Sequence, residues 1–392
     1  MPEQSAPAAT ASAVAAADDA FGGDLYRLLS EQAPDTVFSP VSVASVLQMA
    51  LCGARGQTAA ELAGALHLDG SPQLDGSPLL EGSADTAAEA LRALSALVAG
   101  VTAGGAVTFR APATVWVQAG LPLQASFTAR LGEAVAETDF AGAPQRARAE
   151  INRVVAEQTE DKITGLLPAR AIDGQTRLVL TSAIYLKAGW EQTFPEPATA
   201  DAPFYPDGPD RPSRTVPMMH GTAARMYVRG DGYQAVLLPY RGGSLAMAAV
   251  LPDGPLSALG PAIAAGGVRG LLTGTARFRV TLALPRFRLE AAFDLIPVLR
   301  RLGVQQAFSD GADFGGITEA ARLLISAIAH KAYVDVDEQG TEAAAATAVS
   351  MRPAAAFRVP PPVTMTVDRP FLFAILHTPT GLPLFLGQVT HP

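Results

Sequence analysis

Side chains that could carry out catalysis are few in this chain of 392 residues, and they are scattered. None of its histidines lies three to five residues from another histidine or from the single cysteine, as zinc ligands do: His67, His220, His330, His377 and His391. The cysteine, Cys52, follows an apolar run and has no local motif of a catalytic thiol, so we interpret it as a small buried side chain. The sequence therefore predicts no metal site and no cofactor.

A partial match to a hydrolase motif lies at residues 242–246. The sequence Gly-Gly-Ser-Leu-Ala resembles the turn that presents a nucleophilic serine, but the last glycine of that motif is missing. Two glycines between strand-like segments are also typical of a hairpin turn, which is the interpretation we favour. No phosphate-binding or dinucleotide-binding glycine motif stands between a strand and a helix. We therefore expect no enzyme, with an unrelated hydrolase as an alternative.

Composition excludes several other classes of protein. The chain is 49% hydrophobic and 17% charged, which excludes disorder, and its net charge of −8 without a long basic run argues against nucleic-acid binding. No run of 18 apolar residues predicts a membrane-spanning helix. Residues 1–20 lack the basic start and apolar stretch of a secretory signal. We expect a flexible N-terminal segment, 1–20, and one domain, 21–392, in a soluble, cytoplasmic monomer.

Hydrophobic spacing indicates a mixed chain of helices and strands without internal repeats. Helical spacing is found from Pro40 to Gly53 and in the segments 57–66, 87–101, 146–159 and 293–302. Strand-like segments dominate the rest: 107–118, 177–186, 224–228, 234–239, 245–251, 278–284, 365–375 and 382–389. Because 177–186 is mostly apolar and rich in residues that favour strands, we expect it to be a central strand that is buried on both faces.

One segment, from Glu338 to Val349, has a sequence that conflicts with its surroundings. Its alanines favour a helix, yet it follows strand-like residues and precedes helix-stopping prolines. As a strand it would place small, uncharged residues on one face: Thr341, Ala343, Ala345, Thr347 and Val349. On the other face only Glu342 would need solvent. Small side chains would allow this segment to enter a preformed sheet, and a short surface helix is the alternative.

The same segment resembles the hinge of the reactive loop in serpins, a family of serine-protease inhibitors. Other segments resemble serpin motifs in family order, from about residue 20 to the C-terminus. They are Phe38–Ser42, Asn152–Ile163, Ala183–Trp190, Val216–Met219, Leu284–Phe287, Met365–Ile375 and Leu384–Val389. The chain is therefore identified as a member of this family, similar to inhibitory serpins of bacteria.

The resemblance implies an α+β serpin fold of three β-sheets and about nine helices, with an exposed reactive-centre loop at about 338–362. It assigns the hinge to Glu338, Gly340, Thr341, Glu342, Ala343, Ala344, Ala345, Ala346 and Thr347. It places Trp190 at the top of the main sheet, and a cluster where that sheet opens: Ser39, Ser42, Ser182 and His330. The family usually has asparagine where Ser182 stands, and serine offers one donor instead of two.

The resemblance also implies a mechanism and a partner. A target serine protease attacks the loop and forms an acyl-enzyme, and the freed loop then enters the main sheet as a new strand. Counting along the loop from Glu338 places the scissile bond between Ala354 and Ala355, where small residues suit an elastase-like or subtilisin-like protease. A chymotrypsin-like cut after Phe357 is the second choice. The alternative function is that of a non-inhibitory serpin, a carrier or chaperone.

Overall fold

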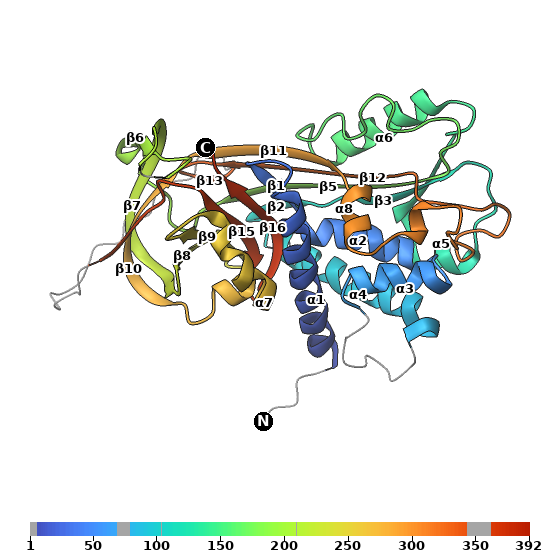
Figure 1. Ribbon diagram of the computed structural model, residues 1–392, viewed down its shortest axis with the longest axis horizontal. Coiled ribbons are helices and arrows are strands. Elements are labelled where there is room, and N and C mark those ends of the chain that lie inside the picture. The colour runs from blue at the N-terminus through green and yellow to red at the C-terminus, as the bar shows by residue number, and fades with distance from the viewer. Residues whose placement is uncertain (1–5, 69–78, 103, 209, 343–361) are drawn as a thin grey trace.

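Most of the helices lie at one end of the elongated molecule beside the smaller sheet, and the larger sheet lies at the other end together with α7 (Gly260–Leu271) (Figure 1). The computed structural model describes residues 6–68, 79–102, 104–208, 210–342 and 362–392. The α-helices in these ranges are α1 (Ala6–Leu29), α2 (Pro40–Leu51), α3 (Gly56–Ala65), α4 (Leu79–Thr102), α5 (Ala125–Leu131), α6 (Pro144–Gln158), α7 (Gly260–Leu271) and α8 (Ile296–Arg301). Short 3-10 helices lie at Gly132–Ala134, Glu196–Ala198, Leu256–Leu259 and Gln306–Phe308.

The smaller sheet runs along the helical end of the molecule, in the order β11-β12-β13-β5-β3-β4, and β2 also pairs with β5. Its strands are β2 (Val107–Arg110), β3 (Ala113–Gln118), β4 (Val135–Thr138), β5 (Leu178–Gly189), β11 (Phe287–Asp294), β12 (Ala327–Val336) and β13 (Gly340–Thr341). The first nine residues of β5 are buried. This confirms the predicted central strand.

The larger sheet has the order β1-β16-β15-β9-β8-β7-β10-β14, and β6 pairs with β7. Its strands are β1 (Thr36–Phe38), β6 (Ala200–Phe204), β7 (Arg214–Gly230), β8 (Tyr233–Pro239), β9 (Leu245–Pro252), β10 (Ala276–Pro285), β14 (Val363–Thr366), β15 (Phe371–His377) and β16 (Leu382–Val389). The described residues form two sheets where the resemblance predicts three. The reason is that the 17-residue β7 pairs with β6 at its start, β10 along its length and β8 at its end.

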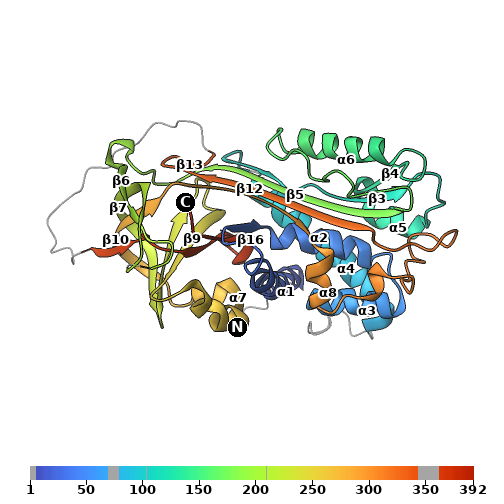
Figure 2. The ribbon, with the colours of Figure 1, turned by 45° about the horizontal axis from the view of Figure 1, so that its top comes forward.

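Helices α2 and α6 cover opposite faces of the smaller sheet (Figure 2). All residues of α2 except Ser45 are buried, as expected for a helix that is apolar on every side. Its start is fixed by Ser39, whose hydroxyl accepts the N–H of Ser42, and by Pro40 at the first helical position. Helix α6 buries only Ala147, Ile151 and Val155 against the sheet, so its other side faces solvent.

Helix α1 begins at Ala6, inside the segment 1–20 that we expect to be flexible. Alanine is the strongest helix former, and buried side chains from Val14 to Leu29 hold the helix against its neighbours. The predicted helix at 293–302 is also too long, because Phe293 belongs to β11 and the helix is Ile296–Arg301. In both places packing decides the boundary.

Candidate functional site

The predicted hinge begins at an ion pair on Glu338. Its side chain is 3% exposed, and the guanidinium of Arg286 donates to both carboxylate oxygens, with the Nε of Arg286 2.8 Å from each. The hydroxyl of Thr199 donates to the same carboxylate. Burial raises the pKa of Glu338, but the hydrogen bonds from Arg286 and Thr199 outweigh burial and hold the pKa below its usual range. This residue is therefore a fixed point from which the rest of the hinge extends.

Trp190 directly follows the last residue of β5 and holds the turn at Asp337–Gln339. Its backbone N–H donates to the carbonyl of Gln339 (2.8 Å), and its indole N–H donates to the carbonyl of Asp337 (2.9 Å). Its ring stacks on Tyr240 with the ring centres 4.4 Å apart, and both side chains are fully buried. The turn is therefore held by both the backbone and the side chain of Trp190.

Two residues of the predicted loop already form a strand in the smaller sheet. In β13, Thr341 lies opposite Ala188 of β5 and opposite Val336 of β12, antiparallel to both strands. Thr341 is fully buried, and its hydroxyl lies 2.6 Å from the hydroxyl of Tyr240. Gly340 has φ 154°, and a Cβ there would lie 2.1 Å from the carbonyl oxygen of Ala188. Only glycine fits this position.

Glu342 ends the inserted segment and faces the side of the sheet that α6 covers. Its carboxylate lies 2.8 Å from the Nζ of Lys162 and accepts a hydrogen bond of 2.7 Å from the hydroxyl of Tyr185. Burial raises the pKa of Glu342, but Lys162 and Tyr185 outweigh it and lower the pKa. At the start of the loop that was expected to be exposed, Glu338, Gly340 and Thr341 are buried, and Gln339 and Glu342 are partly buried.

The four residues predicted at the sheet opening lie together. The N–H of Ser39 donates to Nε2 of His330 (3.0 Å), so Nδ1 carries the proton and donates to the hydroxyl of Ser182 (2.8 Å). Burial lowers the pKa of His330 to about 3, which keeps the ring neutral. The N–H of Ser42 donates to the hydroxyl of Ser39, but the buried hydroxyl of Ser42 forms no hydrogen bond with any described residue.

The hydrogen bond between Ser182 and His330 lies in the closed part of the sheet. Strands β5 and β12 pair directly along 179–184 and 327–332, and this bond joins two residues that are register partners. Further along, β13 separates the two strands. Any strand that extends β13 must therefore part Ser182 from His330. A serine at position 182 is long enough to reach the ring.

Some predicted site residues lie outside the described residues. These are the hinge residues Ala343, Ala344, Ala345, Ala346 and Thr347, the predicted scissile pair Ala354 and Ala355, and the second-choice site Phe357.

Sequence reasoning missed the residues that hold the hinge. Lys162 and Arg286 stand in segments that resemble serpin motifs, but nothing in their spacing indicates the carboxylates they contact, which are 180 and 52 residues away. Tyr185 and Tyr240 are aromatic residues in strands, and such residues are usually read as core. A polar partner for a buried tyrosine hydroxyl is a general expectation, but its identity needs the fold.

Two interpretations from the sequence are confirmed. Cys52 is buried, and burial raises the pKa of its thiol to about 12, so it is not a nucleophile at neutral pH. Gly242 and Gly243, with φ of 88° and 72°, lie in the turn between β8 and β9. This is the hairpin turn that we favour over the strand-to-helix turn of a hydrolase.

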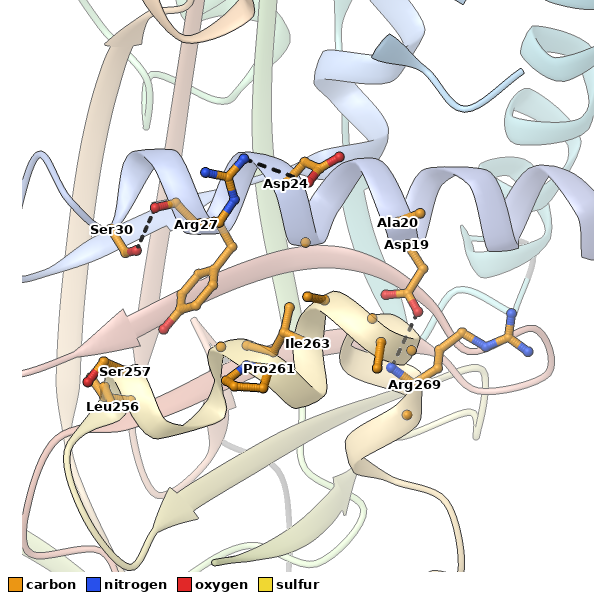
Figure 3. Close-up of a pocket in the computed structure, with 18 of the residues that line it drawn as sticks. Asp19, Ala20, Asp24, Arg27, Ser30, Leu256, Ser257, Pro261, Ile263 and Arg269 are labelled. Atoms are coloured by element: carbon orange, nitrogen blue, oxygen red, sulfur yellow. Dashed lines mark hydrogen bonds and ion pairs between the residues drawn. The ribbon is translucent and has the colours of Figure 1, made fainter. Parts of the chain in front are cut away.

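A cavity of about 1120 Å³ lies between α1 and α7 (Figure 3). Helix α7 is kinked at Gly267 (φ 60°), and the carboxylate of Asp19 accepts the N–H groups of Val268 and Arg269 just after the kink. A Cβ at Gly267 would lie 2.2 Å from that carboxylate. The neighbouring Asp18 is fully buried and forms no hydrogen bond with the described part of the chain, and burial together with the charge of Asp19 raises its pKa to about 8.

Metal-ligand clusters and membrane-spanning helices are both absent from the described ranges. No three His, Cys, Asp or Glu side chains there gather as metal ligands. Within the same ranges, no helix has the length and apolarity needed to cross a membrane.

Comparison with known proteins identifies the family. The sequence model described as serpin (serine protease inhibitor) matches residues 16–392. This chain belongs to the serpin family. An uncharacterized serpin-like protein of Thermococcus kodakarensis is 36% identical to this serpin, covering 95% of this chain and 84% of the relative. The leukocyte elastase inhibitor of Sus scrofa is 35% identical, covering 97% of this chain and 99% of the relative.

Solved structures agree with the fold of this serpin. Native protease nexin-1 with heparin is 28% identical with a TM-score of 0.82, covering 97% of this chain and all of the other. Human thyroxine-binding globulin in complex with its hormone is 27% identical with a TM-score of 0.83, covering 98% and 99%. The α+β serpin fold predicted from the sequence is therefore confirmed, and the family is one of serine-protease inhibitors.

Proposed function

We propose that this serpin inhibits serine proteases as a suicide substrate, by inserting its cleaved loop into the smaller sheet. The observation that carries the proposal is β13, which already lies between β12 and β5 and is antiparallel to both. A strand needs two free edges to enter a sheet, and those edges begin where direct pairing of β12 with β5 ends, after Ala332 and Ile184.

The register of β13 indicates where the next residues would go. Thr341 lies opposite Ala188 on β5, so six residues further along Thr347 would lie opposite Ser182. On the other side Thr341 lies opposite Val336 of β12, so Thr347 would lie opposite His330. The two registers agree because β5 and β12 keep the same offset along the sheet, and both place Thr347 at the pair whose side chains share a hydrogen bond, Ser182 and His330.

Thr347 has the chemistry for that position. Insertion would break the bond between Ser182 and His330 and leave buried polar atoms, which is unfavourable unless they find partners. A threonine hydroxyl both accepts and donates, so Thr347 can accept the Nδ1–H of His330 and donate to Ser182. Its flanking residues, Ala346 and Ala348, would face α6, where small side chains avoid a clash with the packed layer beneath that helix.

The free energy released by loop insertion would be comparable to the stability of a whole domain. A strand from Thr341 to Ala354 would span about 45 Å at ~3.3 Å per residue. The register ends the paired part near Met351, opposite Leu178 at the start of β5. With each ladder hydrogen bond contributing on the order of 1 kcal/mol, insertion would release about 10 kcal/mol, comparable to the stability of an ordinary domain.

We propose an elastase-like target. The predicted scissile bond, Ala354–Ala355, has small residues on both sides that suit a shallow specificity pocket. The similarity to leukocyte elastase inhibitors, at 35% identity over nearly the whole chain, supports the same choice. Phe357 remains the second-choice site, for a chymotrypsin-like protease.

Incubation with pancreatic elastase and with chymotrypsin tests the proposal. An inhibitor forms an SDS-stable complex, whereas a non-inhibitory serpin is only cleaved. Mass spectrometry of the small C-terminal fragment then locates the bond. The fragment should start at Ala355 for the first choice and at Arg358 for a cut after Phe357. Clean cleavage by both proteases without any complex would contradict the inhibitory function.

Carriage of a small molecule is a second candidate function. The cavity between α1 and α7 is large enough for a drug-sized ligand, and one solved structure similar to this serpin is that of a thyroxine-binding globulin. Titration with thyroxine, followed by tryptophan fluorescence, tests this role separately. The expectations of a cytoplasmic location and of a monomer stay predictions.

A further inference from the structure

A buried charge without a partner lies in the larger sheet. Arg225 on β7 is 4% exposed, yet its guanidinium makes no ion pair and donates no hydrogen bond within the described part of the chain. Its Nε is shut off from solvent, while the two terminal nitrogens keep a small opening to water. A buried guanidinium is usually paired with a carboxylate, so this one requires an explanation.

The described neighbours of Arg225 are an aromatic ring and a glycine, and none of them carries a negative charge. The ring of Phe194 lies 5.2 Å from the guanidinium carbon, in a stacked cation–π contact. Gly221 leaves the room for this stacking, because a Cβ there would lie 3.1 Å from the Phe194 ring and 3.8 Å from an Arg225 nitrogen. Burial alone lowers the pKa of Arg225 to about 10, with no compensating carboxylate nearby.

The neighbouring strand β10 and the sequence that leads into β14 contribute no negative charge to Arg225 either. Arg277 and Arg279, which flank the register partner of Arg225 on β10, are exposed and make no ion pair with any described residue. The loop sequence 343–361, which leads into the β14 edge of β10, contains no aspartate or glutamate. Strand alternation places both on the face opposite to Arg225, so neither bears on its pairing. A counter-ion for Arg225 would therefore have to come from outside the described residues.

We propose that Arg225 is the floor of an oxyanion site that takes an external phosphate or carboxylate group. The terminal nitrogens of a guanidinium form a planar fork that donates two parallel hydrogen bonds to such a group. Phe194 holds the fork in one orientation, so less conformational freedom is lost on binding. The site is independent of protease inhibition.

Thermal unfolding in three salts of equal ionic strength tests the proposal: sodium phosphate, sodium acetate and sodium chloride. Phosphate stabilises most folded proteins, so the decisive quantity is the difference between variants. At an anion concentration well above its dissociation constant, the midpoint of the wild type should rise by about 3 °C more than that of Arg225→Met. Arg277→Met, which removes an exposed charge nearby, should respond like the wild type.

The outcomes separate cleanly. A rise with phosphate alone assigns a phosphate-like ligand, and a rise with acetate as well assigns a carboxylate. An equal response of wild type and Arg225→Met, or no response of the wild type beyond that in chloride, would overturn the site. If Arg225→Met does not fold, Arg225→Lys keeps the charge but loses the fork, and its response to phosphate should be weaker.

Discussion

Replacing Thr341 with arginine tests whether β13 is the first step of loop insertion. The side chain of Thr341 is fully buried, so Thr341→Arg would bury a guanidinium without a partner at a cost of several kcal/mol. Leaving the sheet loses the hydrogen bond to Tyr240 and the few ladder bonds of β13, about 1 kcal/mol each. Because burying the unpaired charge should cost more than these few bonds are worth, we expect β13 to leave the sheet while the fold stays intact.

The assay compares Thr341→Arg with the matched control Thr341→Val. Valine has the shape of threonine and loses only the hydroxyl, so that variant should still trap pancreatic elastase in an SDS-stable complex. The arginine variant should be cleaved without trapping, because the inserting strand would have to bury the same charge. Its tryptophan fluorescence should also change, since Trp190 stacks on Tyr240, the partner of Thr341.

One result would refute the reasoning. If Thr341→Arg traps elastase with the same stoichiometry as Thr341→Val, entry of this position into the sheet is not required for inhibition. Unchanged fluorescence together with lost trapping would be a narrower correction, because β13 would then tolerate the charge in the native state but not during insertion.

Three further predictions concern stability. Cleavage of the loop between Val349 and Arg358 should raise the midpoint of thermal unfolding, whereas a nick in an ordinary loop leaves it equal or lower. His330→Ala should leave Ser182 and the Ser39 N–H without partners and open the sheet, so mild heating should produce polymers on size-exclusion chromatography; a variant that stays monomeric rules out this role. The pKa of Asp18 is raised from its ordinary value near 4 to about 8, so between these pH values the folded state binds a proton that the unfolded state does not. The free energy of unfolding should therefore fall by up to about 1.4 kcal/mol per pH unit as the pH rises through this range, and the unfolding midpoint should fall with it. Asp18→Asn should remove that slope, and an unchanged slope would assign it to other groups.

The sequence was most informative where one side chain's size or polarity decides its position. The apolar run in β5 predicts a strand buried on both faces, and β5 is one. The hydroxyl and imidazole groups of the sheet-opening cluster were located by resemblance, and Ser39, Ser182 and His330 do meet. These features depend on local pattern or on family motifs that persist in this chain.

What the sequence could not provide depends on energy differences between alternatives. Whether Thr341 is exposed or inserted is decided by Tyr240, a residue 101 positions away, and no local pattern encodes that contact. The helix that starts at Ala6 was missed because alanine-rich, polar stretches are common in flexible segments too, and only packing against other helices selects the helical state. Ser42 lies in the predicted cluster, but its hydroxyl has no role that the sequence or the structure explains.

The length of the slot between β12 and β5 divides the loop into two parts with different freedom to vary. Because β5 starts at Leu178 and β12 at Ala327, a strand that continues β13 runs out of partners near Met351. If the loop inserts as we propose, residues before this point must fit a packed layer, whereas residues after it have no strand partner in the slot. Residues beyond Met351 should therefore be exchangeable for the recognition sequences of other proteases without changing how the loop inserts.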